Sequence, residues 1–205
     1  MARPDDTAPG GGTSGERAQV VLITGEPGSG KSTLGAELSR ALRVPFIARD
    51  DVRGGLFMTT GAWSARPRGV PTSEDAVETF LHLVETTASV GVSCIAEHVF
   101  LRGREADLAR LTAVADCTVL HTWSRDALAR FARRNAADRL LNRQPVLDSL
   151  GYATIGDHTT EAVARMQAVA GEMRTTFDLP NLEVNTDGGY DPGIDDIVDF
   201  VIGGG

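Results

Sequence analysis

The chain has 205 residues, a net charge of −8 and a pI of about 5.0, with 41% hydrophobic and 23% charged residues. This composition is typical of one globular domain with a substantial core, and no run of 18 apolar residues is present that would cross a membrane. The acidic balance argues against a nucleic-acid partner, because phosphate backbones are bound by basic faces, and it favours a small-molecule partner.

The N-terminal segment, residues 1–17, is rich in Gly, Pro, Asp and Thr and carries almost no apolar side chains. Such a segment cannot bury enough surface to offset its ordering entropy, so we expect a disordered tail before a single domain at 18–203. It lacks the apolar stretch of a secretory signal. Cys94 and Cys117 lie in apolar runs typical of buried strands, so we expect free thiols and a cytoplasmic location.

Taken in order, the chain alternates apolar runs with segments of helical spacing. The apolar runs typical of buried strands occupy 19–25, 44–50, 92–100, 117–123 and 181–187. The helical segments occupy 32–42, 72–91, 105–115, 124–143, 159–177 and 193–202, and residues 58–71 and 144–158 are predicted loops. Strands that alternate with helices indicate an α/β fold with a parallel sheet covered by helices on both faces.

The first strand runs directly into the segment GEPGSGKST, which fits the pattern G-x-x-x-x-G-K-[ST]. Its glycines turn the backbone so that N–H groups face phosphate oxygens, and the next helix directs its positive end at the same point. Lys31, the only lysine among 20 basic residues, would place a compact charge between the β- and γ-phosphates, where a planar guanidinium fits poorly. Ser32 would offer its hydroxyl to Mg²⁺. The predicted nucleotide-binding residues of this loop are Gly25, Glu26, Pro27, Gly28, Ser29, Gly30, Lys31, Ser32 and Thr33.

Two acids and an arginine follow the second predicted strand, at Asp50, Asp51 and Arg53. In a doubly wound sheet this strand end lies at the ligand crevice, beside the phosphate-binding loop. A carboxylate there can accept the proton of an acceptor hydroxyl, and Arg53 can hold an anionic or polar part of the acceptor. The alternative is a helix N-terminus that carries acids for structural reasons.

The segments GEPGSGKSTL and RDDVR together resemble the P-loop kinases of the polynucleotide-kinase and zeta-toxin-like branch. That branch is close to chloramphenicol-phosphotransferase-like and shikimate- or gluconate-kinase-like enzymes. The resemblance covers residues 18–203 and implies a five-stranded sheet of order 2-3-1-4-5 with an arginine-rich lid at about 124–158. It also implies that Asp50 is the general base and that Arg53 contacts a phosphate of the acceptor. No fused phosphatase domain is found, which is a departure from many polynucleotide kinases.

In this branch a lid helix carries arginines that clamp the transferring phosphate, and here it corresponds to residues 124–143. Arg130 and Arg134 are four residues apart and share one helix face, which Asp138 ends. Arg134 is therefore the first candidate, and Arg130 and Arg139 come next. The lid arginines are Arg130, Arg133, Arg134, Arg139 and Arg143. The alternative is a basic face that points to solvent.

Three further residues are candidates for the acceptor site. Glu97 and His98 end the third predicted strand, where this branch has residues near the magnesium ion or the acceptor. Trp63 lies in the predicted loop and would stack on a flat substrate ring. The alternatives are a solvent-facing acid, a packed histidine, and a tryptophan that packs on its own domain.

These observations predict a phosphotransferase that moves the γ-phosphoryl group of ATP or GTP, with Mg²⁺, to a hydroxyl group of a small molecule. The candidate acceptors are nucleosides, sugars, cyclitols and antibiotics that phosphorylation would inactivate. One alternative is a polynucleotide 5′-hydroxyl kinase, which the RDDVR stretch favours and the acidic charge disfavours. The other alternative is a nucleotide-binding switch without transfer activity. The sequence contains no motif that reads the base or sets an oligomeric state.

Overall fold

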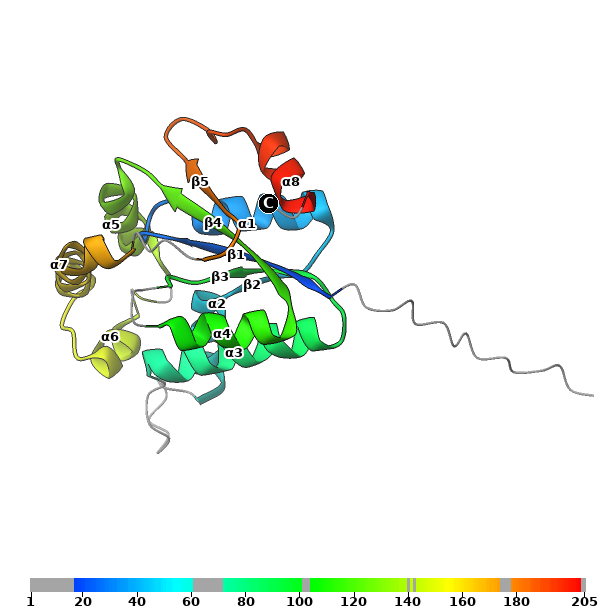
Figure 1. Ribbon diagram of the computed structural model, residues 1–205. Helices are drawn as coiled ribbons and strands as arrows, with labels where there is room; N and C mark the ends of the chain where they lie inside the picture. Colours follow the sequence, from blue (N-terminus) through cyan, green and yellow to red (C-terminus); the bar gives the residue numbers. More distant parts are fainter. Residues whose placement is uncertain are drawn as a thin grey trace, which may run out of the picture.

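The computed structural model describes residues 17–60, 72–100, 104–139, 141, 143–173 and 178–203 (Figure 1). Residues 1–16 of the predicted tail and residues 61–71 of the predicted loop, Trp63 included, lie outside the described residues.

The strands are β1 (Gln19–Gly25), β2 (Phe46–Ala48), β3 (Cys94–Glu97), β4 (Asp116–Trp123) and β5 (Asn181–Asn185). The helices are α1 (Lys31–Leu42), α2 (Arg49–Thr60), α3 (Ser73–Ser89), α4 (Glu105–Val114), α5 (Ala127–Ala137), α6 (Gln144–Leu150), α7 (Ile155–Met173) and α8 (Ile194–Ile202). No helix in the described ranges is long and apolar enough to cross a membrane.

The five strands form one parallel sheet in the order β2-β3-β1-β4-β5, as predicted. All five strands therefore end at the same edge of the sheet. The central strand β1 runs between β3 and β4, and its end continues into the phosphate-binding loop. This edge is where a doubly wound sheet places its ligands.

Alternate residues of β1 enter two separate hydrophobic cores, because successive strand side chains point to opposite faces. Val20 and Leu22 pack against α3 and α4, whereas Val21 and Ile23 pack against α1 and α8. Figure 1 shows these two helix pairs on opposite sides of the sheet. A sheet buried on both faces accounts for the continuous apolar runs of the strands.

The two cysteines confirm the prediction of buried free thiols. Cys94 of β3 and Cys117 of β4 are both paired in register with Val20 of the central strand, and both are buried. Burial raises the pKa of each thiol to about 11. The thiolate is therefore a minor species near neutral pH, and both residues are core side chains.

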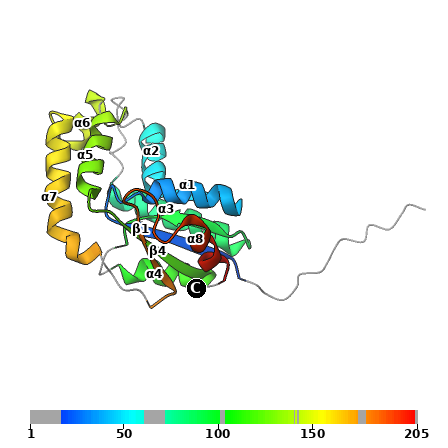
Figure 2. The same cartoon turned by 90° about the horizontal axis from the view of Figure 1, so that it is seen from above.

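The predicted boundaries are wrong in the segment that follows β4. The expected single helix at 124–143 is two helices, α5 and α6, and the expected loop at 144–158 contains α6 and the start of α7. Helix α5 ends at Ala137 because Asp138 adopts an extended conformation, and its carboxylate accepts a hydrogen bond from the Leu141 amide at 2.9 Å. Figure 2 shows α5, α6 and α7 grouped at one end of the molecule.

The second predicted strand is also shorter than expected. It ends at Ala48, and the next residue already begins α2, which extends to Thr60 and so into the predicted loop. Asp50 and Asp51 lie in the first turn of α2, where carboxylates stabilise the positive end of a helix. The two acids therefore agree with the alternative that they stabilise a helix N-terminus. They also lie at the edge of the sheet where all five strands end.

Candidate active site

The loop between β1 and α1 has the conformation that its glycines predict. Gly28 and Gly30 have φ angles of 87° and 91°, which side chains with a Cβ atom rarely adopt. Gly30 caps α1, and Lys31 is the first residue of that helix. The neighbouring strand β4 fixes the position of the loop, because the hydroxyl groups of Ser29 and Thr122 are hydrogen-bonded at 2.7 Å.

Lys31 is 7% exposed, and its ammonium group donates hydrogen bonds to the backbone oxygens of Gly25 and Glu26, both at 2.9 Å. Burial lowers the pKa of Lys31 to about 8, although the nearby carboxylates of Glu97 and Asp50 oppose this shift. The ammonium group of Lys31 is therefore surrounded by the phosphate-binding loop, and the nearby carboxylates only partly neutralise its charge. A phosphate oxygen there would replace the carbonyl contacts with a stronger, charge-assisted one.

Gly28→Ala is expected to lower the free energy of unfolding by about 2–4 kcal/mol, because it adds left-handed backbone strain to a steric clash. A methyl group at Gly28 would lie 2.9 Å from the backbone nitrogen of Phe131 and closer still to the carbonyl oxygen of Ala127. Gly188→Ala is the matched control: φ there is 78° and no atom lies within 4 Å of the added methyl group. Urea unfolding of both variants checks this, and equal losses would show that the clash has no effect.

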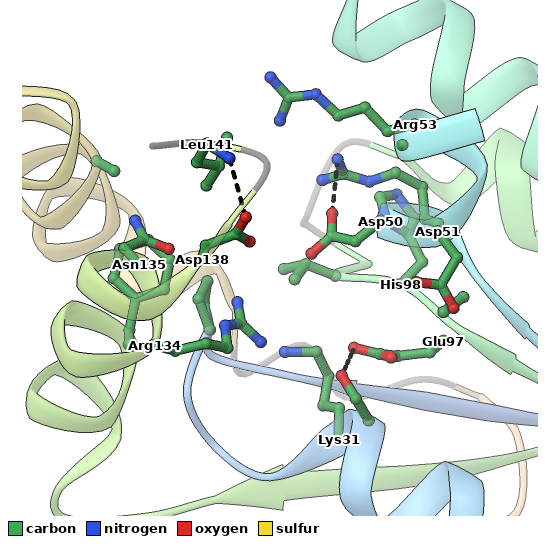
Figure 3. Close-up of a pocket in the computed structure, with 18 of the residues that line it drawn as sticks. Lys31, Asp50, Asp51, Arg53, Glu97, His98, Arg134, Asn135, Asp138 and Leu141 are labelled. Carbon is green, nitrogen blue, oxygen red and sulfur yellow. Dashed lines mark hydrogen bonds and ion pairs between the residues drawn. The ribbon is translucent and has the colours of Figure 1, made fainter. Parts of the chain in front are cut away.

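A pocket of about 570 Å³ opens beside the loop at the carboxyl edge of the sheet. Lys31 of α1, Asp50 of α2, Glu97 of β3 and Arg134 of α5 all line it. Figure 3 shows the side chains of Lys31 and Arg134 extending toward each other from opposite sides. Residues separated by up to about a hundred positions in the sequence therefore meet around one cavity.

Asp50 lies in this pocket in an ion pair with the preceding arginine. The Arg49 guanidinium is 3.0 Å from the Asp50 carboxylate, whose side chain is 64% exposed. One carboxylate oxygen therefore has a charged partner, while the group stays accessible from the pocket. Arg53, one turn further along α2, also lines the pocket.

Glu97 is buried beneath the pocket and faces the start of α1. Its Oε1 accepts a hydrogen bond from the Ser32 hydroxyl at 3.2 Å, and its buried Oε2 has no hydrogen-bond partner among the described residues. Burial raises the pKa of Glu97, and the Lys31 charge and the Ser32 hydrogen bond oppose the shift. The strand-end acid therefore does not face solvent, and it leaves an unsatisfied oxygen beside the phosphate-binding loop.

The structure separates the predicted lid arginines. Arg134 lines the pocket, whereas Arg130 donates hydrogen bonds to Thr186 Oγ1 at 3.1 Å and to the Thr186 carbonyl oxygen at 3.2 Å. Thr186 Oγ1 in turn donates to the Ser29 carbonyl oxygen at 3.0 Å, so Arg130 braces the phosphate-binding loop. Arg133 and Arg139 are exposed and do not line this pocket, and Arg139 lies beyond the end of α5.

His98 follows Glu97 and lines the same pocket from a largely apolar setting. Its ring lies between Phe80 and Phe100, with centroid distances of 5.6 and 5.1 Å. It is 6% exposed, and neither ring nitrogen has a hydrogen-bond partner in the described part of the chain. Burial lowers the pKa of His98 to about 3, and the charge of Arg49 adds to this effect.

Acidification is therefore expected to destabilise the protein through His98. Below pH 6.5 the unfolded chain binds a proton at this residue and the folded chain does not, so stability falls as the pH drops toward 3. Between pH 6.5 and pH 5 this contribution is roughly 2 kcal/mol. We expect His98→Phe, which sacrifices no hydrogen bond, to lack that part of the pH dependence in urea unfolding. Parallel pH profiles for the two proteins would contradict this assignment.

Sequence reasoning missed the contribution of α7. His158, Ala162 and Arg165 line the pocket, and their spacing of four and three residues places them on one helix face. This helical spacing is visible in the sequence, but no local signal shows against which element the helix face packs. Helix α7 is joined to α5 by the Asn135 side-chain amide, which donates to the Thr159 hydroxyl at 3.5 Å.

Comparisons with known proteins agree with this arrangement. A candidate kinase from Chloroflexus aurantiacus J-10-fl superposes with a TM-score of 0.66 at 20% identity, over 92% of this chain and 99% of that chain. A sugar kinase from Janibacter sp. HTCC2649 superposes with a TM-score of 0.52 at 15% identity, over 92% and 94% of the two chains. At these identities the likeness shows the fold, which is a kinase-like P-loop fold. No match is found among the curated proteins. The family model described as an AAA domain matches residues 20–145, which is more than half of the sequence, and the chain therefore belongs to the AAA domain family.

Proposed function

We propose that the protein is a phosphotransferase that moves the γ-phosphoryl group of a nucleoside triphosphate to a hydroxyl group of a small molecule. The observation that carries the proposal is the convergence of Lys31, Asp50, Glu97 and Arg134 on one pocket beside the phosphate-binding loop. A binding module needs the loop alone. The additional carboxylate and arginine in the same cavity are the groups that phosphoryl transfer to an alcohol requires.

The phosphate-binding loop would hold the β- and γ-phosphates through its backbone N–H groups and the positive end of α1. Lys31 Nζ, which now contacts the Gly25 and Glu26 carbonyl oxygens, would turn to a bridging position between these phosphates. Arg134 extends toward Lys31 from the opposite wall of the pocket (Figure 3). Its guanidinium would stabilise the charge on the transferring group from the side that the loop leaves open.

The residues beside Lys31 fit a magnesium ion. The Ser32 hydroxyl and the Glu97 carboxylate are hard oxygen ligands, and Glu97 Oε2 is buried without a hydrogen-bond partner among the described residues. Ser32 and Glu97 would hold the ion, Glu97 directly or through a bound water. When bound, Mg²⁺ supplies positive charge to the β- and γ-phosphate oxygens.

Asp50 would act on the acceptor. Its carboxylate would accept the proton of the acceptor hydroxyl as that oxygen forms a bond to the γ-phosphorus, and the bond from phosphorus to the β–γ bridging oxygen breaks. The Arg49 ion pair at 3.0 Å holds the carboxylate in place at the start of α2. His98 and Arg53 line the acceptor side, and Trp63 remains a predicted contact.

Mass spectrometry of γ-phosphoryl transfer tests the proposal. The protein is incubated with Mg²⁺ and ATP or GTP, and with two acceptor pools in parallel. One pool contains 5′-hydroxyl oligonucleotides, and the other contains nucleosides, sugars, cyclitols and hydroxyl-bearing antibiotics. A phosphorylated small molecule is the expected product. A phosphorylated oligonucleotide would replace the proposal with the polynucleotide kinase, and nucleotide binding without any transfer would favour the switch.

A further inference from the structure

The segment that follows β5 packs against the phosphate-binding loop from outside the pocket. Thr186, the first residue after β5, is 7% exposed, and it does not line the pocket. A methyl group added at Gly30 would lie 3.1 Å from Thr186 Cγ2 and 3.2 Å from Thr186 Oγ1. The Thr186 side chain therefore lies directly against the last glycine of the loop.

The Thr186 hydroxyl holds one peptide group of the loop. Its Oγ1 donates a buried hydrogen bond to the Ser29 carbonyl oxygen at 3.0 Å. This carbonyl belongs to the same trans peptide as the Gly30 N–H, and the C=O and N–H groups of a trans peptide point in opposite directions. Thr186 therefore directs the Gly30 N–H away from β5 and toward the open side of the loop.

The other polar groups of Ser29 also have protein partners, whereas the Gly30 amide has none. The Ser29 amide donates to the Glu26 carbonyl oxygen at 3.0 Å, and the Ser29 hydroxyl is hydrogen-bonded to Thr122 Oγ1 at 2.7 Å. The Gly30 amide donates to no acceptor among the residues that the structure describes. Ser29 is therefore fixed within the protein, and the next N–H of the chain is left for a ligand.

Arg130 of α5 sets the direction of the Thr186 hydroxyl. Its guanidinium donates to Thr186 Oγ1 at 3.1 Å and to the Thr186 carbonyl oxygen at 3.2 Å. A hydroxyl has a single hydrogen to donate, and the Ser29 carbonyl oxygen at 3.0 Å is nearer than the Trp123 carbonyl oxygen at 3.4 Å. Because a charge-assisted donor occupies the other side of Oγ1, the hydroxyl is polarised and its bond to Ser29 is strengthened.

We propose that Thr186 is a positioning residue for nucleotide binding. Its hydroxyl fixes the Ser29–Gly30 peptide so that the Gly30 N–H meets a phosphate oxygen of the nucleotide, and Arg130 acts on the loop through that hydroxyl. Arg130 thus has an indirect role, where the lid pattern predicted direct contact with the transferring phosphate. The inference rests on the proposed function only as far as nucleotide binding at the loop, and does not depend on transfer to an acceptor.

Thr186→Val is the main test, because it keeps the shape of the side chain and removes the hydroxyl. We expect the Kd for MgADP, measured by calorimetry, to rise by about tenfold, the usual effect of losing one hydrogen bond to a charged group. Thr186→Ser keeps the hydroxyl and should bind MgADP like the unaltered protein. Thr118→Val makes the same exchange at a buried position of β4 that is in register with Val21, away from the loop, and should leave the Kd unchanged.

Two results of this titration would overturn the inference. One is an unchanged Kd in Thr186→Val. The other is an equal loss in Thr186→Val and Thr186→Ser, which would show that packing of the side chain against Gly30 matters and the hydroxyl does not.

Urea unfolding separates this role from a purely structural one. MgADP binds the folded chain and raises the urea midpoint. If Thr186 only stabilised the fold, Thr186→Val would lower the midpoint equally with and without MgADP. We expect the increase that MgADP causes to become smaller in Thr186→Val, and an unchanged increase would contradict the assignment.

A measurement on the unaltered protein keeps the inference testable if Thr186→Val does not fold. In protein labelled with ¹⁵N-glycine, the Gly30 amide proton should move downfield when MgADP is added, because its N–H then donates to a phosphate oxygen. Gly91, an exposed glycine between α3 and β3, is the internal control and should not move. A Gly30 signal that MgADP leaves in place would overturn the inference.

Arg130→Gln tests the indirect role of Arg130. The substitution should raise the Kd for MgADP in the unaltered protein and add little in Thr186→Val, since residues that act through one contact are not additive. Additive losses would show that Arg130 acts on the nucleotide independently of Thr186, which contradicts the proposed role.

The kinase proposal fails separately. MgADP binding that depends on Thr186, without transfer to any hydroxyl compound, would remove the kinase proposal and support this inference. Transfer by the unaltered protein, with normal MgADP binding by Thr186→Val, would do the opposite.

Discussion

Asp50→Asn is expected to lower the rate constant of phosphoryl transfer by about 10²–10⁴-fold, the usual contribution of a general base. The amide keeps the size of the carboxylate and loses its ability to accept the hydroxyl proton. Asp50 lies on α2, outside the phosphate-binding loop, so the dissociation constant for the nucleotide should change little. Single-turnover transfer, combined with nucleotide titration, separates these two effects.

Two further variants make this result specific. Asp195→Asn places the same substitution at an exposed position in the first turn of another helix, α8, and should leave transfer unchanged. Asp51→Asn changes the neighbouring acid, which also lines the pocket. If Asp51→Asn abolishes transfer and Asp50→Asn retains it, the base is Asp51. If both variants retain full turnover, neither carboxylate removes the proton.

Lys31→Arg is expected to lower the rate of phosphoryl transfer by about 10²–10³-fold, even though the substitution preserves the charge. This is the usual effect of removing one hydrogen-bond donor to the transition state. Lys31 is 7% exposed and its ammonium group makes two hydrogen bonds of 2.9 Å to the carbonyl oxygens of Gly25 and Glu26. A planar guanidinium is larger and directional, so it cannot occupy this space or swing from the carbonyl oxygens to the phosphates. The measurement is kcat/KM for the nucleotide, compared with Lys31→Met.

The two substitutions at Lys31 should therefore have similar effects, because shape and not charge alone decides the function of this position. Arg40→Lys, in the last turn of the same helix, is the control for a basic exchange and should change neither folding nor transfer. Full activity of Lys31→Arg, together with loss of activity in Lys31→Met, would show instead that any positive charge suffices.

Local signals in the sequence account for the elements that were predicted correctly. The capping box of α3 illustrates this: the Thr72 hydroxyl accepts from the Asp75 amide at 3.0 Å, and the Asp75 carboxylate accepts from the Thr72 amide at 2.8 Å. Both partners lie within four residues, so the sequence alone predicts the helix start.

A capping box also begins α7, although the predicted helix begins only at residue 159. The Thr154 hydroxyl accepts from the Asp157 amide and the Asp157 carboxylate accepts from the Thr154 amide, both at 3.1 Å. Helix α6 was missed in a similar way, although a proline in its first turn and Gly151 after its last residue mark its two ends. The ends of α6 and α7 can be predicted from the sequence, because the residues that mark them lie within a few positions of each end.

The strand order was implied by the family resemblance. The sequence by itself determined the phosphate-binding loop, the parallel α/β sheet, and the placement of Asp50 just after a strand and of Glu97 at a strand end. Each follows from a motif or a period that acts over a few residues. The sequence placed Arg134 first among the lid arginines, but only the tertiary structure shows why Arg130 has a different role. Arg130 and Arg134 have equivalent helical spacing, but Thr186 of the segment after β5 binds Arg130 and leaves Arg134 at the cavity. Tertiary structure also brought His158 to the side of Arg53, because contacts between distant helices depend on how whole faces pack and not on any local pattern.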